Sequence, residues 1–169
     1  MDASLLQADC EQCAALCCVA LAFDQSEWFP IDKPNGVVCP QLNSQNRCNS
    51  YEQREPLGYK GCMKFDCHGA GQRVTQEVFG GRSWREDAAL LPEMTQAFVV
   101  MRRVHDQLTL LLEASKLPLN EDELGLFEQF MHELSPEEGW TEALLEGYEQ
   151  SGLEKRLKAY LMTLRHHVA

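Results

Sequence analysis

The sequence predicts an α-rich protein of the α+β class, in which a Cys-rich, metal-organised N-terminal module packs on a C-terminal antiparallel helical bundle. Two observations support this prediction. All eight cysteines of the 169-residue chain lie between residues 10 and 67. From about residue 83, cysteine is absent and apolar residues recur at the spacing of amphipathic helices. We therefore expect residues 1–85 to form a Cys-rich metal-binding module and residues 86–169 to form an acidic helical bundle.

The cysteines form two sets of four. The first set is Cys10, Cys13, Cys17 and Cys18, and the second is Cys39, Cys48, Cys62 and Cys67. A Cys-x2-Cys step brings two sulfurs within reach of one metal ion, and the first three sulfurs converge on either a helix or a knuckle. The adjacent pair Cys17–Cys18 suits two metals or a bridging thiolate, unless one of them is simply a buried small side chain. All eight are predicted metal ligands, in two four-sulfur sites, one cluster or a two-metal centre.

A small hairpin is predicted within the module. Val37 and Val38 lead into Cys39 as a β-branched run, and polar turn residues follow before Cys48. Strands joined in this way hold Cys39 and Cys48 side by side.

The sequence favours the cytoplasm. Its first nine residues hold two acids and no base, which is not the pattern of an export signal, and the apolar stretch 14–23 is too short to span a bilayer. In a reducing compartment, clustered cysteines are more often metal ligands or reactive thiols than disulfides. Reversible thiol redox chemistry and inert structural thiols are the alternatives to metal binding.

Zinc is the predicted metal. Sulfur ligands suit zinc and iron–sulfur clusters and exclude magnesium and calcium. Zinc needs only tetrahedral sulfur and contributes directly to folding free energy. An iron–sulfur cluster is the alternative, because the first motif is close to a ferredoxin run of short cysteine spacings.

The cysteine spacing also resembles a known family. The pattern consists of Cys10-x2-Cys13-x3-Cys17-Cys18, Cys39-Pro40-x-Leu42, Arg47-Cys48-x2-Tyr51-x2-Arg54, Cys62 and Phe65-x-Cys67. It resembles the CxxCxxCC family, a bacterial zinc- or iron-chelating domain with eight cysteines, over about residues 9–68. The resemblance implies metal ligation by all eight and supplies no substrate. The chain departs from the family in the three residues before Cys17 and in a longer interval between Arg54 and Cys62. A second resemblance is carried by Cys67-His68-Gly69-Ala70-Gly71-Gln72, Phe79-Gly80-Gly81 and Trp84-Arg85. These residues resemble a cysteine-rich module found beside pentapeptide repeats in some bacterial proteins, although no run of such repeats is present.

Four helices are predicted after residue 86. Pro92 fits the first turn of a long helix that ends at Leu117–Pro118, and Asn120 with Glu123 predicts the N-cap of the next. Ser135–Pro136 predicts the start of a third helix, which Ser151–Gly152 ends before a last one. Short joints between such helices predict an antiparallel bundle.

No catalytic constellation is recognisable, so the sequence leaves open whether the protein is an enzyme. It holds no nucleophile elbow and no paired-histidine metalloprotease motif. His68 follows Cys67 and could bind metal or hydrogen-bond a thiolate, although a solvent-exposed loop histidine is the simpler interpretation. The adjacent pair His166–His167 is expected to have no role beyond adventitious chelation.

Charge limits the partners. Residues 1–86 carry 8 bases and 11 acids, and residues 87–169 carry 7 and 15, which together give the net charge of −11. An acidic surface argues against nucleic-acid binding. The expected partners are metal ions and a protein that contacts the acidic helical half. The predicted function is a cytosolic metal-binding protein with structural zinc. The first alternative is an iron–sulfur protein or a subunit of a metal-dependent enzyme, and the second is a thiol redox sensor or metal-delivery protein.

Overall fold

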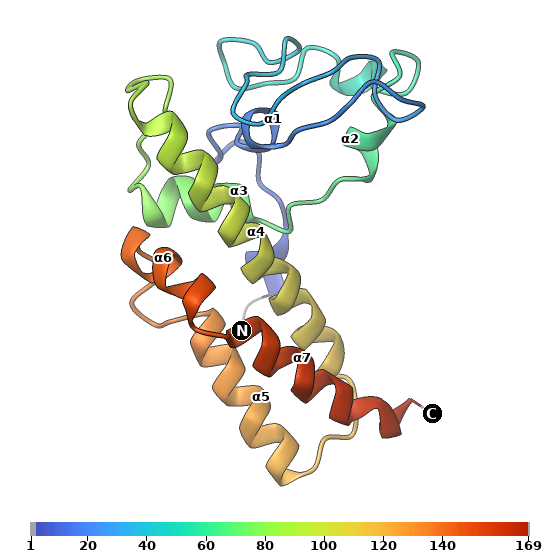
Figure 1. The fold of residues 1–169 in the computed structure, drawn as a ribbon, viewed down its shortest axis with the longest axis vertical. Coiled ribbons are helices and arrows are strands. Elements are labelled where there is room, and N and C mark those ends of the chain that lie inside the picture. Colours follow the sequence, from blue (N-terminus) through green and yellow to red (C-terminus); the bar gives the residue numbers. More distant parts are fainter. Residues whose placement is uncertain (1–2, 169) are drawn as a thin grey trace.

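The computed structural model describes residues 3–168, in a loop-rich end and a helical half (Figure 1). Met1, Asp2 and Ala169 lie outside the described residues, and so do the outer ends of the predicted regions 1–85 and 86–169. The prediction of an α-rich fold is confirmed, because the regular elements of the described chain are helical apart from two isolated β-bridges. No helix within residues 3–168 combines the length and the apolar character needed to cross a membrane.

The helical half is built from four consecutive helices. These are α4 (Leu90–Ala114), α5 (Glu121–Leu134), α6 (Glu142–Gln150) and α7 (Leu153–Thr163), and a 3₁₀ turn, η4 (Leu164–His167), follows. The chain runs along α4, returns along α5 and then follows α6 and α7 in turn (Figure 1). The left-handed Gly152, with φ of 66°, separates α6 from α7, so the predicted break at Ser151–Gly152 is confirmed.

The start of α5 agrees with its local sequence signal. Asn120 Oδ1 accepts a hydrogen bond from the backbone N–H of Glu123 at 3.0 Å, and the Glu123 carboxylate accepts from Asn120 N at 2.9 Å. This reciprocal capping box satisfies two of the N–H groups that a helix start leaves without partners.

The predicted start of the third helix at Ser135–Pro136 is wrong. Helix α6 begins at Glu142, with Thr141 as the cap whose hydroxyl accepts from Leu144 N at 3.3 Å. The preceding residues turn instead, because Gly139 adopts a φ of 81° and the Trp140 N–H donates to the carboxylate of Glu77. The Glu77 carboxylate thus accepts a hydrogen bond from the Trp140 N–H, which would have bonded within the predicted helix.

The loop-rich end contains only short elements. They are η1 (Ala3–Leu6), α1 (Cys17–Ala20), η2 (Tyr51–Gln53), α2 (Lys60–Lys64), α3 (Ala70–Arg73) and η3, a π-helical turn over Val74–Val78. The predicted hairpin is not confirmed. Residues 36–39 form no strand, and Leu42 and Cys48 pair only as an isolated antiparallel bridge. Two hydrogen bonds, between Asn43 and Arg47 and between Gln41 and Asn49, complete a tight turn there.

One hydrophobic core joins the two ends. Helices α1 and α3 pack on α4, and Leu16, Val19 and Val74 belong to the same buried cluster as Phe98 and Met101. The stretch 21–68 contributes little to this core. Its buried residues are Lys33, Cys39, Ser50 and Tyr59.

Candidate metal centre

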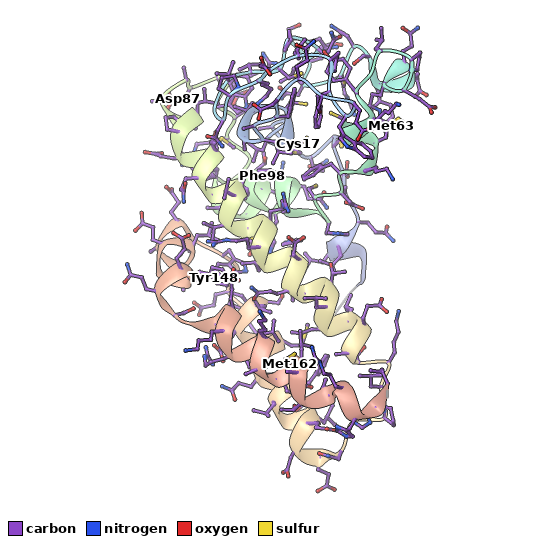
Figure 2. The ribbon with its side chains drawn as sticks, turned by 45° about the vertical axis from the view of Figure 1, so that its right-hand side comes forward. Cys17, Met63, Asp87, Phe98, Tyr148 and Met162 are labelled. Carbon is purple, nitrogen blue, oxygen red and sulfur yellow. The ribbon has the colours of Figure 1, made fainter. Side chains whose placement is uncertain are left out.

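The eight cysteines all lie in the loop-rich end, where Figure 2 labels Cys17 and Met63. They come from the loop before α1, from α1, from the loop between α1 and η2, from α2 and from the loop before α3. In that order they are Cys10 and Cys13, Cys17 and Cys18, Cys39 and Cys48, Cys62, and Cys67. Every one is a free thiol rather than half of a disulfide. Cysteines up to 57 residues apart in the sequence therefore share one end of the molecule.

Side chains from α3, η3 and Trp84 hold the first cysteine loop, residues 7–16. The hydroxyl of Thr75 accepts a hydrogen bond from Ala14 N at 3.0 Å, and Trp84 Nε1 donates to the Ala14 carbonyl at 2.7 Å. Two side-chain amides bind further carbonyls of the loop, Gln72 to Gln7 at 2.9 Å and Gln76 to Gln12 at 2.8 Å. The loop is therefore ordered by long-range contacts rather than by secondary structure of its own.

The sulfur of Cys13 packs directly on the backbone of α3. A Cβ at position 71 would lie 2.6 Å from Cys13 Sγ, so only glycine leaves room for this sulfur. Two residues after Cys13, Ala15 has a φ of 56°, a left-handed conformation that costs energy for a residue with a Cβ. Such strain concentrates at functional sites, where the surrounding contacts impose it.

A buried lysine lies beside the other cysteines. The side chain of Lys33 is inserted at the end of α1, where Nζ donates to the carbonyls of Val19 at 3.0 Å, Pro34 at 3.2 Å and Leu21. Burial lowers the pKa of Lys33, whereas charge on Cys39, Cys18, Cys17 and Cys62 would raise it. A positive group is thus placed where thiolates would form.

Burial raises the pKa of most of these thiols. It raises the pKa of Cys13 to about 12 and that of Cys62 to about 11, and the charge of neighbouring thiolates acts in the same direction. For Cys17, the hydrogen bond with Cys18 is the largest cause and burial the next, and the pKa lies well above its ordinary value. Burial also raises the pKa of Cys10 and Cys39. These groups are neutral thiols at pH 7 unless a cation compensates their charge.

The same electrostatic effects divide the thiols into two groups. Charge on Cys17 and on Cys67 raises the pKa of both Cys10 and Cys13, so we call Cys10, Cys13, Cys17 and Cys67 the Cys10 group. Charge on Cys48 and on Cys17 raises the pKa of both Cys39 and Cys62, so we call Cys39, Cys48 and Cys62 the Cys39 group. Cys17 links the two groups, because its charge also raises the pKa of Cys39 and Cys62.

The sulfur atoms do not form a closed coordination shell. Within residues 3–168, which include all eight cysteines, no three sulfurs lie within 4.8 Å of one another. Sulfurs that share one tetrahedral zinc lie about 3.8 Å apart, given Zn–S bonds of about 2.3 Å. The donor chemistry therefore fits zinc or an iron–sulfur cluster, whereas the spacing of the thiols is wider than that of a four-sulfur site.

His68 does not join these groups. Its ring nitrogen Nδ1 lies 3.7 Å from Asp66 Oδ2, and its backbone N–H donates to Asp66 Oδ1 at 2.7 Å. The φ of 47° at His68 and of 82° at Gly69 turns the chain sharply after Cys67 into α3. His68 therefore shapes the turn that follows Cys67.

Sequence reasoning missed the residues that support the cysteines. Lys33 lies in a polar stretch between Asp32 and Pro34, and no local pattern shows that its amino group is buried. Thr75 and Trp84 bind a loop 61 and 70 residues earlier in the chain. No local signal marks contacts of this range.

The comparisons with known proteins name no function. No model of a known protein family matches the chain, and no solved structure matches it. The chain is similar to the uncharacterized protein YybG of Bacillus subtilis (strain 168), with 36% identity over 114 residues. The alignment covers 68% of this chain and 41% of the relative, so the chain spans about two fifths of that protein's length. The zinc site, the CxxCxxCC family and the cytoplasmic location therefore stay predictions.

Proposed function

We propose that this chain is a cytosolic metal-binding protein that holds about two zinc ions through its eight cysteines, at four sulfurs per ion. The zinc is structural and organises the loop-rich end. The acidic helical half contacts a protein partner.

The sparse core of residues 21–68 carries this proposal. Only Lys33, Cys39, Ser50 and Tyr59 are buried in this stretch, which has no strand and only two short helical turns. Ordering a residue costs about 1–2 kcal/mol of backbone entropy. The four buried residues and the partly buried Leu21, Val38, Leu42 and Phe65 offset only part of that cost for 48 residues. Small metal-binding regions fold because binding free energy replaces a hydrophobic core.

The two thiol groups supply the ligands. The Cys10 group contains four sulfurs and would hold one ion. The Cys39 group contains three, and Cys18 would complete a second set, because the backbone N–H of Cys39 donates to the Cys18 carbonyl at 2.9 Å. Lys33 would offset part of the charge of the thiolates.

The raised thiol pKa values favour metal ligation over thiol catalysis. A nucleophilic or redox-sensing cysteine needs a lowered pKa and access to solvent. Partial burial disfavours the charged forms of Cys13 and Cys62 and raises their pKa values to about 12 and about 11. A metal ion displaces the thiol protons and supplies the missing positive charge. The redox-sensor alternative is therefore less well supported than zinc, whereas an iron–sulfur cluster, which needs the same donors, stays the main alternative.

A groove between α4 and α6 supports the proposed partner. Its floor is apolar, with the buried side chains of Ala97, Val100 and Leu145. Its rim carries four exposed carboxylates, from Glu93, Glu142, Glu146 and Glu149, of which Glu149 is already paired with Arg103. Charge complementarity favours a basic segment of a partner protein at this groove.

Elemental analysis tests the metal proposal. The protein is purified anaerobically without a histidine tag, and its zinc, iron and sulfide contents are measured with its absorption spectrum. We expect about two zinc ions per chain, one per four sulfurs, and no visible colour. Iron with sulfide and a brown colour would replace zinc by the iron–sulfur alternative. A protein without metal would contradict both.

A pair of substitutions in α2 tests the ligands. Cys62→Ser should lose about one zinc ion and lower the free energy of unfolding, because a ligand is removed. Met63→Ser changes the next position of the same helix, which is exposed, and should keep the zinc content and the free energy of unfolding of the wild type. Equal zinc contents in the two variants would exclude Cys62 as a ligand. Cys13→Ser repeats the test for the Cys10 group.

A further inference from the structure

Three metal-ligand side chains converge at the far end of the helical half from the cysteines. Glu123 lies in the first turn of α5, and His166 and His167 lie in η4 after α7. Their ligand atoms all lie within 4.8 Å of one another, and no other such group of histidine, cysteine or acidic side chains occurs within residues 3–168. Residues 43 and 44 positions apart thus meet at one place.

A backbone hydrogen bond orients His166 for metal binding. His166 Nδ1 lies 2.8 Å from the carbonyl oxygen of Thr163, which only accepts, so Nδ1 carries the proton. The other nitrogen, Nε2, then holds a lone pair in the neutral ring and faces Glu123 Oε1 at 3.5 Å. Metal-binding histidines commonly donate their second N–H to a carbonyl in this way.

His167 completes the arrangement. Its Nε2 lies 2.9 Å from Glu123 Oε2, and the side chains of His167 and Glu123 are only 12% and 11% exposed. Glu123 is itself held in place, since its carboxylate accepts from Asn120 N and its backbone carbonyl accepts from Tyr160. The donors of Glu123 and His167 are thus positioned before any ion binds.

We propose that Glu123, His166 and His167 bind one divalent transition-metal ion, such as Zn²⁺, Ni²⁺ or Cu²⁺. Two imidazole nitrogens and one carboxylate suit these ions, and three protein ligands leave a coordination position open to water. For the ion to bind Nε2 of His167, the proton that this nitrogen donates to Glu123 is released from the charged ring, or the neutral ring takes the tautomer protonated at Nδ1. The ion joins the last turn of the described chain to the start of α5. This site is independent of the cysteines.

Titration with Ni²⁺ tests the site in protein loaded with only two zinc ions per chain, the number that the eight cysteines hold on the proposed function. Calorimetry should detect one Ni²⁺ per chain beyond the zinc already bound. Paramagnetic broadening in an amide NMR spectrum should be confined to residues around Glu123 and η4. Broadening around the cysteines instead, or no Ni²⁺ binding, would overturn the proposal.

Three variants separate this site from chelation by a histidine pair alone. His166→Asn and Glu123→Gln should each weaken Ni²⁺ binding by more than about tenfold, the loss seen even for outer-shell partners of a metal. His132→Asn, on the exposed face of α5, should leave it unchanged. Unchanged affinity in Glu123→Gln would mean adventitious binding to two histidines and would overturn the three-ligand site. His166 is 60% exposed, so its substitution keeps the test open if Glu123→Gln fails to fold.

Cys62→Ser distinguishes a failure of this proposal from a failure of the zinc function. This variant should keep its Ni²⁺ site while it loses zinc from the cysteines. If the wild type holds no zinc but still binds Ni²⁺ at Glu123, only the cysteine proposal fails. If zinc is present and Ni²⁺ does not bind, only this inference fails.

Discussion

Residues 21–68 and the long helix α4 are organised by different means, although they belong to one chain. The first stretch buries four residues, of which two, Lys33 and Ser50, are polar. Helix α4 is only 25 residues long and buries twelve of them, including Phe98, Met101 and Leu111. Full burial of one large apolar side chain is worth about 1.5–3 kcal/mol. Apolar packing thus accounts for the helical half, whereas the loop-rich stretch depends on its polar contacts and, on the proposed function, on the metal that its thiols bind.

Metal removal should produce the largest difference between the two regions. On the proposed function, a zinc chelator should expose the backbone amides of residues 21–68 to hydrogen exchange, because binding free energy is lost from the folding of that stretch. The amides of α4 and α5 should stay protected. Hydrogen exchange measured by mass spectrometry checks this, with zinc-saturated chelator as the control. Equal protection in both samples would contradict a structural role for the metal.

A core substitution in α4 should destabilise the helical half without loss of zinc. Leu111 is 0% exposed, so Leu111→Ala should lower the free energy of unfolding by about 2–5 kcal/mol through lost burial and a cavity. Leu110→Ala, at the adjacent position that is 52% exposed, should cost far less. Denaturant unfolding measures the difference. Zinc content should be unchanged in both variants, and zinc loss in Leu111→Ala would show that the two ends are not stabilised separately.

Acid should weaken the helical half through His105. Burial lowers the pKa of this histidine to about 4, and its Nδ1 donates to the carbonyl of His68. The unfolded chain, with an ordinary histidine pKa of about 6.5, takes up the proton first as the pH falls. This group's contribution is therefore full above pH 6.5 and is lost between about pH 6.5 and 4, by about 3 kcal/mol in total.

A variant isolates this contribution. His105→Phe should show a smaller fall in the free energy of unfolding than the wild type over the same pH range, because the titrating group is gone. Denaturant unfolding of both proteins from pH 7 to pH 4, with zinc content measured at each pH, makes the comparison, because zinc release affects both proteins alike. Parallel pH profiles for the two proteins would rule out His105 as a source of acid sensitivity.

A glycine pair sharpens the comparison at the smallest scale. Gly125 in α5 has open space where a Cβ would lie, so Gly125→Ala should stabilise the protein by about 0.5–1 kcal/mol through helix propensity. Gly71 in α3 contacts Cys13 Sγ, so Gly71→Ala should displace this sulfur and lower zinc content. Thermal unfolding and metal analysis measure the two effects. A stabilised, fully zinc-loaded Gly71→Ala would show that the contact with Cys13 is not required.

Local signals in the sequence predicted the helical half well. The capping box at Asn120, the end of α4 before Pro118 and the left-handed Gly152 each depend on residues within one helical turn. Ser135–Pro136 has an equally good local pattern and failed. There the carboxylate of Glu77, 63 residues away from Trp140, binds the backbone and a turn replaces the helix. Local propensity is decisive only where no tertiary contact competes.

The candidate site was likewise predictable only in part. The sequence shows which residues carry sulfur, and the eight cysteines do lie at one end of the fold. The buried position of Lys33 and the contact between Glu123, His166 and His167 arise only when distant segments meet. Neither follows a short-range pattern, so neither could be read from the chain alone. The hairpin failed for a related reason, since one bridge at Leu42–Cys48 satisfies the turn without strands.

The contacts that hold the first cysteine loop can form only late in the synthesis of the chain. Ala14 is held by Thr75 and Trp84, which follow it by 61 and 70 residues. At about 5–20 residues per second, a ribosome needs roughly 3–14 seconds to add that length of chain. Throughout this interval Cys10 and Cys13 exist without the side chains that later hold their loop. The loop that carries Cys10 and Cys13 therefore takes its folded conformation only after Thr75 and Trp84 have been synthesised.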